Sequence, residues 1–157
     1  MKRSNYYKLQ EGINRCAKFK GGKFQYALAK NMKKVQEEIE SIEKAFEPSV
    51  EFLEFEKHKN QLLFDHCQKD ATGQLVINQG TREITFESVE KRNAFQQKFD
   101  ELKGRYQDAI EERDGQIREK MAFLDEESGP VEWQLIKAED VPDDATGDLM
   151  LIAEFLE

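Results

Sequence analysis

The stretch that decides the fold is FQYALAKNMKKVQEEIESIEKAF, which runs from Phe24 to Phe46. Its large apolar side chains recur every three or four residues, a spacing that places them on one face of an α-helix for about six turns. The members of this stripe are Phe24, Leu28, Met32, Val35, Ile39, Ile42 and Phe46. Such a stripe is typical of a helix that supports a fold, so we predict a scaffold helix rather than a catalytic segment.

The remaining sequence divides at turn-forming residues into further elements of one predicted domain, residues 1–157. Gly21 and Gly22 separate a short N-terminal helix from the scaffold helix, and Pro48 either starts a new helix or kinks a longer one. Ser88 is a suitable N-cap for a second long helix. The predicted segments are a basic N-terminal helix and turn (1–22), a helical arm (23–69), a β-hairpin (70–87), a long helix (88–127) and a strand-turn-helix (128–157).

The predicted fold class is mainly α with a small β part (α+β). The two long helical segments are expected to form a long antiparallel helical hairpin, held by coiled-coil-like apolar stripes. At its tip, residues 75–77 and 84–86 read as a β-hairpin around the linker 78–81, and residues 131–137 are expected to add a third strand. A short C-terminal helix is predicted from Thr146 to Leu156.

Charge is distributed unevenly along the chain. Residues 1–34 contain ten basic residues and one acid, a net charge of +9, whereas residues 35–157 carry −17. Cations interleaved with aromatic side chains are suited to phosphate contact and base stacking, but the same cations alternatively neutralise the protein's own acidic surface. The candidate residues for binding an anionic partner are Arg15, Lys18, Lys20, Lys23, Lys30, Lys33 and Lys34.

The predicted C-terminal helix is apolar on two sides. One side is expected to seat the helix on the fold and consists of Leu149, Ile152 and Leu156. The other side is the candidate protein interface and consists of Met150, Leu151 and Phe155. A helix of this kind is either fully buried or shared, so we expect docking by a protein partner or a second copy. The acids of residues 139–157 are expected to face the basic residues 1–34, in the same chain or between copies.

No arrangement of residues predicts catalysis, a cofactor or a metal site. His58 and His66 are eight residues apart, about 12 Å along a helix, which is too far for one ion. Cys16 and Cys67 match no metal or redox spacing and are expected to be reduced thiols. No hydrolase or nucleotide fingerprint, membrane-spanning run or secretory leader is found in the sequence. We therefore expect neither an enzyme nor a membrane partner.

Three stretches carry a family resemblance. They are the basic helix Tyr26–Glu38 with its Lys30-Asn31 pair, the glycine-turn segment Lys69–Ile77 followed by Ile84–Phe86 and Phe95, and the strand-turn-helix Val131–Phe155, above all Ile136–Pro142 and the apolar helix after it. Over about residues 9–156 the chain resembles small proteins of tailed bacteriophages and prophages that form a domain of unknown function. The resemblance implies a phage setting, a mainly helical fold and no catalytic residues. The expected location is the host bacterial cytoplasm or the virion.

Three functions fit these expectations. The preferred one is a non-enzymatic protein–protein interaction protein, either a virion or tail-assembly component or a factor directed at a host protein, because scaffold stripes dominate the sequence. The second is nucleic-acid binding through residues 1–34, which predicts a steep loss of affinity with salt. The third is an acidic nucleic-acid mimic, in which residues 37–56 and 101–119 occupy the basic groove of a host DNA-binding or defence protein.

Overall fold

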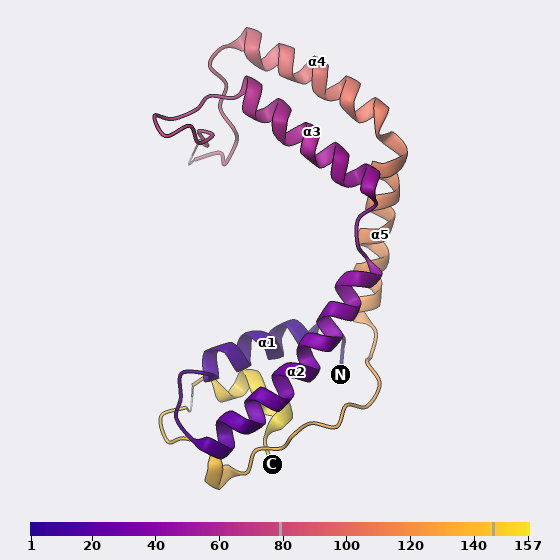
Figure 1. Cartoon of the computed structure of the whole chain (residues 1–157). Helices are drawn as coiled ribbons and strands as arrows, with labels where there is room; N and C mark the ends of the chain where they lie inside the picture. Colours follow the sequence, from indigo (N-terminus) through magenta and orange to yellow (C-terminus); the bar gives the residue numbers. More distant parts are fainter. Residues whose placement is uncertain (79, 146) are drawn as a thin grey trace. The chain divides into compact units, whose positions relative to one another are not determined.

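The structure is a computed structural model that describes residues 1–78, 80–145 and 147–157 (Figure 1). It is mainly helical, as predicted. Its α-helices are α1 (Asn5–Cys16), α2 (Gly22–Ala45), α3 (Val50–His66), α4 (Val89–Arg105) and α5 (Gln107–Asp125), and its 3₁₀ helices are η1 (Ala138–Asp140) and η2 (Leu149–Phe155). Within the described ranges, no helix is both long and apolar enough to cross a membrane.

The chain divides into two compact units where the sequence predicted a single domain. The terminal unit consists of Met1–Glu47 and Ile117–Glu157, and the central unit consists of Pro48–Gln116. The second boundary falls inside α5, so this helix contributes residues to both units.

The predicted scaffold helix is α2 of the terminal unit. It begins at Gly22 after Gly21, whose φ of 153° is a conformation that residues with side chains rarely adopt. The predicted stripe is confirmed, because four of its members are buried and the other three pack against the core. The buried members are Phe24, Leu28, Val35 and Ile42, and the partly buried members are Met32, Ile39 and Phe46.

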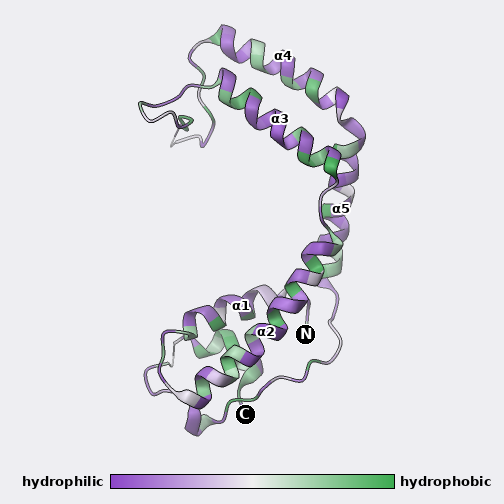
Figure 2. Ribbon diagram, viewed as in Figure 1, coloured by the Kyte–Doolittle hydropathy of each residue, from purple (hydrophilic) through white to green (hydrophobic). Residues whose placement is uncertain are grey.

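α1 and η2 complete the core over α2. α1 contributes Tyr6, Leu9, Ile13 and Cys16, and η2 contributes Ile152 and Phe155. Figure 2 shows η2 as a mostly hydrophobic segment beside α1. The two elements approach closely at Gly12, where an added Cβ would lie 2.7 Å from the Leu151 Cβ. The absence of a side chain at this position therefore sets the distance between α1 and η2.

The first residues of the chain pair with the end of α5. Ser4 N–H donates to the Leu124 carbonyl at 2.9 Å, Arg3 N–H donates to the Glu126 carbonyl at 3.0 Å, and the Arg3 guanidinium lies 4.0 Å from the Phe123 ring centroid. These contacts join residues more than a hundred positions apart, so no local pattern in the sequence predicts them.

In the central unit, α3 packs against α4 through aromatic side chains. The Ser49 hydroxyl accepts a hydrogen bond from Phe52 N–H and caps α3. Pro48 therefore lies between α2, which ends at Ala45, and a new helix, and it does not kink a longer one. Phe55 is buried, with ring centroids 6.4 Å from Phe99 and 6.0 Å from Tyr106. The hairpin is therefore held mainly by ring contacts along one face of each helix.

The predicted long helix over residues 88–127 is interrupted. Ser88 caps it as predicted, by accepting a hydrogen bond from Lys91 N–H. Tyr106 then leaves the helical region, with φ −112° and ψ 22°, and separates α4 from α5. The Tyr106 ring contacts Phe55 and His58 of α3, and the preceding Gly104 weakens the helix locally. Packing against α3 therefore outweighs the continuous apolar period.

The predicted β-hairpin of residues 70–87 is wrong. Among the described residues it forms no strand, only isolated antiparallel bridges between Lys69 and Leu75, Ile77 and Ile84, and Cys67 and Phe86. Gln79 of its predicted linker lies outside the described residues. Two short paired segments are marginal without an apolar layer beneath them, and Ile77 is itself exposed.

The predicted third strand and C-terminal helix are also corrected. Residues 131–137 form a single parallel bridge, between Ile136 and Leu156, instead of a strand. Thr146 lies outside the described residues, and the described part of the predicted helix is the 3₁₀ element η2, which is kinked at Ile152. Ile136 N–H donates to the Phe155 carbonyl at 2.7 Å, and this tertiary hydrogen bond competes with the regular helical pattern.

Candidate interaction surface

Two of the predicted cationic residues pair with acids of the C-terminal segment. Lys18 Nζ lies 2.8 Å from Asp148 Oδ2, and Lys23 Nζ lies 3.1 Å from Asp140 Oδ1. The hydrogen bond to Asp140 raises the pKa of Lys23, so this ammonium keeps its charge. The predicted meeting of the basic and acidic ends thus occurs within one chain.

Two further candidates pair within their own helices. Arg15 contacts Glu11, one turn earlier in α1, and Lys33 Nζ lies 3.8 Å from Glu37 Oε1 in α2. Exposed pairs of this kind contribute only about 0.3–0.5 kcal/mol, so they bias the side chains without holding them.

The last three candidates differ in their surroundings. Lys34 Nζ donates to the Glu132 carbonyl, and Lys30 Nζ lies 5.6 Å from the Tyr26 ring centroid. Lys20 is exposed in the turn before α2. Six of the seven candidates therefore each contact a different partner within the chain.

One face of α2 holds residues 132–140, a segment that ends in the 3₁₀ helix η1. The contacts follow the helix in the antiparallel direction: Lys23 reaches Asp140, Asn31 reaches Gln134 and Lys34 reaches Glu132. These residues recur at helical spacing, so α2 uses a polar stripe beside its apolar stripe. The result is an ordered groove at the start of α2.

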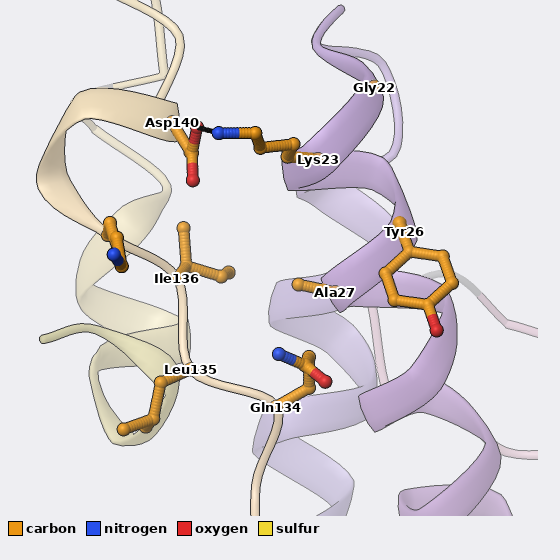
Figure 3. A pocket seen from close by; sticks show the side chains of 9 residues that line it. Gly22, Lys23, Tyr26, Ala27, Gln134, Leu135, Ile136 and Asp140 are labelled. Atoms are coloured by element: carbon orange, nitrogen blue, oxygen red, sulfur yellow. Dashed lines mark ion pairs between the residues drawn. The ribbon is translucent and has the colours of Figure 1, made fainter.

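The groove has a volume of about 410 Å³ and is shown in Figure 3. Its lining consists of Gly22, Lys23, Tyr26, Ala27, Gln134, Leu135, Ile136, Lys137 and Asp140. In Figure 3 the Asp140 carboxylate meets the Lys23 ammonium at one end, and the Leu135 side chain points away from α2. Tyr26 is 58% exposed and Leu135 is 47% exposed, so the groove presents two apolar side chains beside the Lys23–Asp140 pair and the exposed Lys137.

The predicted interface residues of the C-terminal segment separate into three environments. Met150 is 86% exposed, Leu151 is partly buried against Gly12 of α1, and Phe155 is fully buried beside Trp133 at 5.0 Å between ring centroids. Phe155 is therefore a core residue and not an interface residue. The 3₁₀ geometry causes the change, because three residues per turn place residues 152 and 155 on the same side.

Leu135 is an exposed apolar residue that the sequence analysis did not select. Its signal was present: the alternation of residues 131–137 fails at Ile136, which is buried although the alternation would face it outward. Because the side chain of Ile136 points into the core, the side chain of its neighbour Leu135 points to the surface.

The histidines and cysteines do not assemble a reactive centre. Burial raises the pKa of both the Cys16 and the Cys67 thiols, and neither cysteine is in a disulfide. His66 Nε2 lies 3.4 Å from Lys98 Nζ, and its buried Nδ1 has no hydrogen-bond partner among the described residues. Across the described ranges, no group of three or more histidine, cysteine or acidic side chains is placed to hold a metal ion.

Comparisons with known proteins leave the family unassigned. No family model, curated protein or solved structure matches the chain.

Proposed function

We propose that the protein is a non-enzymatic protein–protein interaction protein, acting in the phage setting that the sequence resemblance implies. Its partner is either a phage structural protein, as in a virion or tail-assembly component, or a host protein. The exposed apolar side chains of the terminal unit carry this proposal, since Met150, Tyr26 and Leu135 are the kind of residue that interfaces bury.

The pairing of charges within the chain supports a protein partner over a nucleic acid. Phosphate binding requires cations that are available together, and Lys18 and Lys23 already contact acids of the same chain. Any phosphate at these positions would compete with Asp148 and Asp140, and would meet their negative charge nearby.

The test compares partner recovery by the affinity-tagged full chain and by a Met150→Asp/Leu135→Asp double variant. Asn14→Asp/Gln36→Asp is the matched control, because both residues are exposed on helices of the terminal unit and the two changes also add two carboxylates. We expect a protein that co-purifies from nuclease-treated bacterial lysate with the wild type and the control but not with the double variant. Thermal unfolding followed by circular dichroism checks that all three chains fold equally.

Other outcomes contradict the proposal. In a parallel pull-down from lysate without nuclease, recovery of DNA or RNA that falls steeply with salt and requires Lys18 and Lys20 would instead establish nucleic-acid binding. A DNA-handling enzyme recovered equally by all three chains would favour mimicry by the acidic helix faces.

A further inference from the structure

We propose that the groove between the first turns of α4 and residues 83–86 is a docking site for an extended peptide segment of a protein partner. The peptide would present apolar side chains and an acidic side chain. The inference rests on the proposed function and deepens it, because it names a binding position in the central unit and the chemistry of the partner.

The groove is larger than the one beside α2 and mostly apolar. Its volume is about 690 Å³. Its apolar lining comes from α3, α4 and the segment that precedes α4, and consists of Leu63, Ile84, Phe86, Val89 and Phe95. Val89 is 69% exposed and lines the groove together with the aromatic residues Phe86 and Phe95. An apolar side chain of a partner inserted here would bury apolar surface that is otherwise exposed to solvent.

One edge of residues 83–86 is already paired within the chain. The Glu83 carbonyl accepts from Asn78 N–H at 2.8 Å, Thr85 N–H donates to the Val76 carbonyl at 3.0 Å, and the Thr85 carbonyl accepts from Gln68 N–H at 2.9 Å. Successive residues of an extended chain direct their backbone groups to opposite sides. The alternate residues of this segment therefore direct theirs away from that edge.

The opposite edge is unpaired. Within the described part of the chain, the backbone N–H and C=O groups of Ile84 and Phe86 have no hydrogen-bond partner. Two residues of this spacing provide donors and acceptors in the pattern that an added strand uses. An extended backbone satisfies this whole pattern, whereas a compact small molecule or a helix does not. This is the reason for assigning an extended peptide to the groove.

Arg92 specifies the charge of the peptide. It lines the groove one helical turn from both Val89 and Phe95 and is exposed. Its backbone N–H donates to the Ser88 carbonyl, whereas its guanidinium makes no ion pair or hydrogen bond with the described residues. A guanidinium binds a carboxylate through two parallel hydrogen bonds and prefers it to other groups. A basic residue of the peptide beside Arg92 would be repelled by the guanidinium, and an acidic residue beside Glu83, which also lines the groove, would be repelled by that carboxylate. The acidic side chain of the peptide is therefore expected at the Arg92 end.

The test selects peptides of about ten residues from a randomised displayed library on the immobilised full chain. We expect enrichment of sequences with alternating apolar residues and one Asp or Glu. A selected peptide, synthesised with a fluorophore, is then titrated by fluorescence anisotropy. Arg92→Glu is expected to weaken its binding at least about tenfold, and exchanging the acid of the peptide for Lys should restore binding to this variant.

Two more variants and one control distinguish how the backbone edge, the apolar lining and the charge of Arg92 contribute to peptide binding. Ile84→Pro removes a donor that has no partner within the chain, so it should weaken peptide binding about tenfold while leaving the melting temperature close to wild type. Val89→Asp places a charge in the apolar lining and should also abolish binding. Lys91→Glu makes the same charge change as Arg92→Glu on the adjacent exposed residue, outside the groove lining, and should bind normally.

The outcomes distinguish this inference from the proposed function. A library that yields no binder, or binders insensitive to Arg92→Glu and Ile84→Pro, overturns the groove assignment even if a partner still depends on Met150 and Leu135. A molecular mass that doubles in solution and falls to that of one chain in Val89→Asp would assign the groove to a second copy and also overturn it. If the peptide binds as expected but no partner depends on Met150 and Leu135, the groove is confirmed as a peptide site. The proposed interaction surface of the terminal unit is then wrong.

Discussion

The side-chain amide of Asn31 makes both backbone hydrogen bonds of Gln134, a residue 103 positions away. Asn31 Nδ2 donates to the Gln134 carbonyl at 2.9 Å, and Gln134 N–H donates to Asn31 Oδ1 at 2.8 Å. Asn31 is 0% exposed, and it is the one polar residue in a core that is otherwise hydrophobic among the described residues. The amide thus takes the place of a neighbouring strand and fixes an extended segment against α2 without a sheet.

Asn31→Leu should destabilise the protein by about 1–3 kcal/mol, because it leaves a backbone donor and a backbone acceptor of Gln134 without partners. Equilibrium unfolding in guanidinium measures the loss. Gln134→Ala is the control and should change stability by less than about 0.5 kcal/mol, since the two bonds use its backbone. Equal effects of the two changes would show that the amide is not what holds the segment.

Gly12→Ala and Gly104→Ala should have opposite effects, although both replace a helical glycine. A Cβ at Gly12 would lie 2.7 Å from Leu151 Cβ and 2.9 Å from Ile152 Cγ2, so we expect a net loss of about 1–3 kcal/mol. A Cβ at Gly104 would meet nothing within 4 Å, so alanine should stabilise α4 by up to about 1 kcal/mol. Melting temperatures of the two variants check the signs, and a stabilised Gly12→Ala would refute the close approach of α1 and η2.

Val35→Asp should unfold the terminal unit, because Val35 is fully buried in the apolar stripe of α2 and an unpaired carboxylate there costs several kcal/mol. Ile39→Asp should cost less, since Ile39 is partly buried. Gln36→Asp is the control: it adds the same charge to the exposed neighbour and should keep the wild-type melting curve. A wild-type melting curve for Val35→Asp would mean that the stripe of α2 is not the core.

The Tyr7 hydroxyl donates to Glu43 Oε1 at 2.5 Å, and Lys120 Nζ donates to Glu43 Oε2 at 2.6 Å, so three helices of the terminal unit meet at one carboxylate. Burial, followed by the hydrogen bond to Glu43, raises the pKa of Tyr7 to about 12. An unfolded tyrosine ionises near about pH 10. The folded state therefore retains a proton that the unfolded chain loses, and stability should fall as the pH rises from about 10 to about 12.

The measurement compares the unfolding free energy of the wild type with that of Tyr7→Phe across this alkaline range. The advantage of the wild type should be complete below about pH 10 and should shrink as Tyr7 loses its proton. If the difference in unfolding free energy between the two chains stays constant with pH, folding does not raise the pKa of Tyr7.

Much of the helical structure follows from short-range patterns in the sequence. The stripe from Phe24 to Phe46 forms α2 because apolar residues at helical spacing bury one face wherever a core is available. Gly21 forms the turn before α2 because its backbone takes a positive φ. Ser88 caps α4 because its hydroxyl accepts a hydrogen bond from a nearby backbone N–H group. Each of these preferences depends on residues only a few positions apart, so it can be predicted from the sequence without the tertiary structure.

The candidate site could be predicted only in part. The sequence pointed to the basic N-terminal residues and to Met150, and the structure adds which acids Lys18 and Lys23 contact. Those pairs join opposite ends of the chain, and their formation depends on how α1, α2 and the C-terminal segment pack. The exposure of Leu135 likewise depends on Ile136 turning into the core.

The sequence by itself determined the positions of most helices, the sharp turn before α2 and the uneven charge. Tertiary structure alone decided that residues 131–137 would pair with the Asn31 side chain instead of a strand, that Tyr106 would interrupt a helix, and that Phe155 would enter the core. The physical reason is that hydrogen bonding in an extended segment and burial of a single ring are satisfied by partners distant in the sequence, whereas helical hydrogen bonds close within one turn.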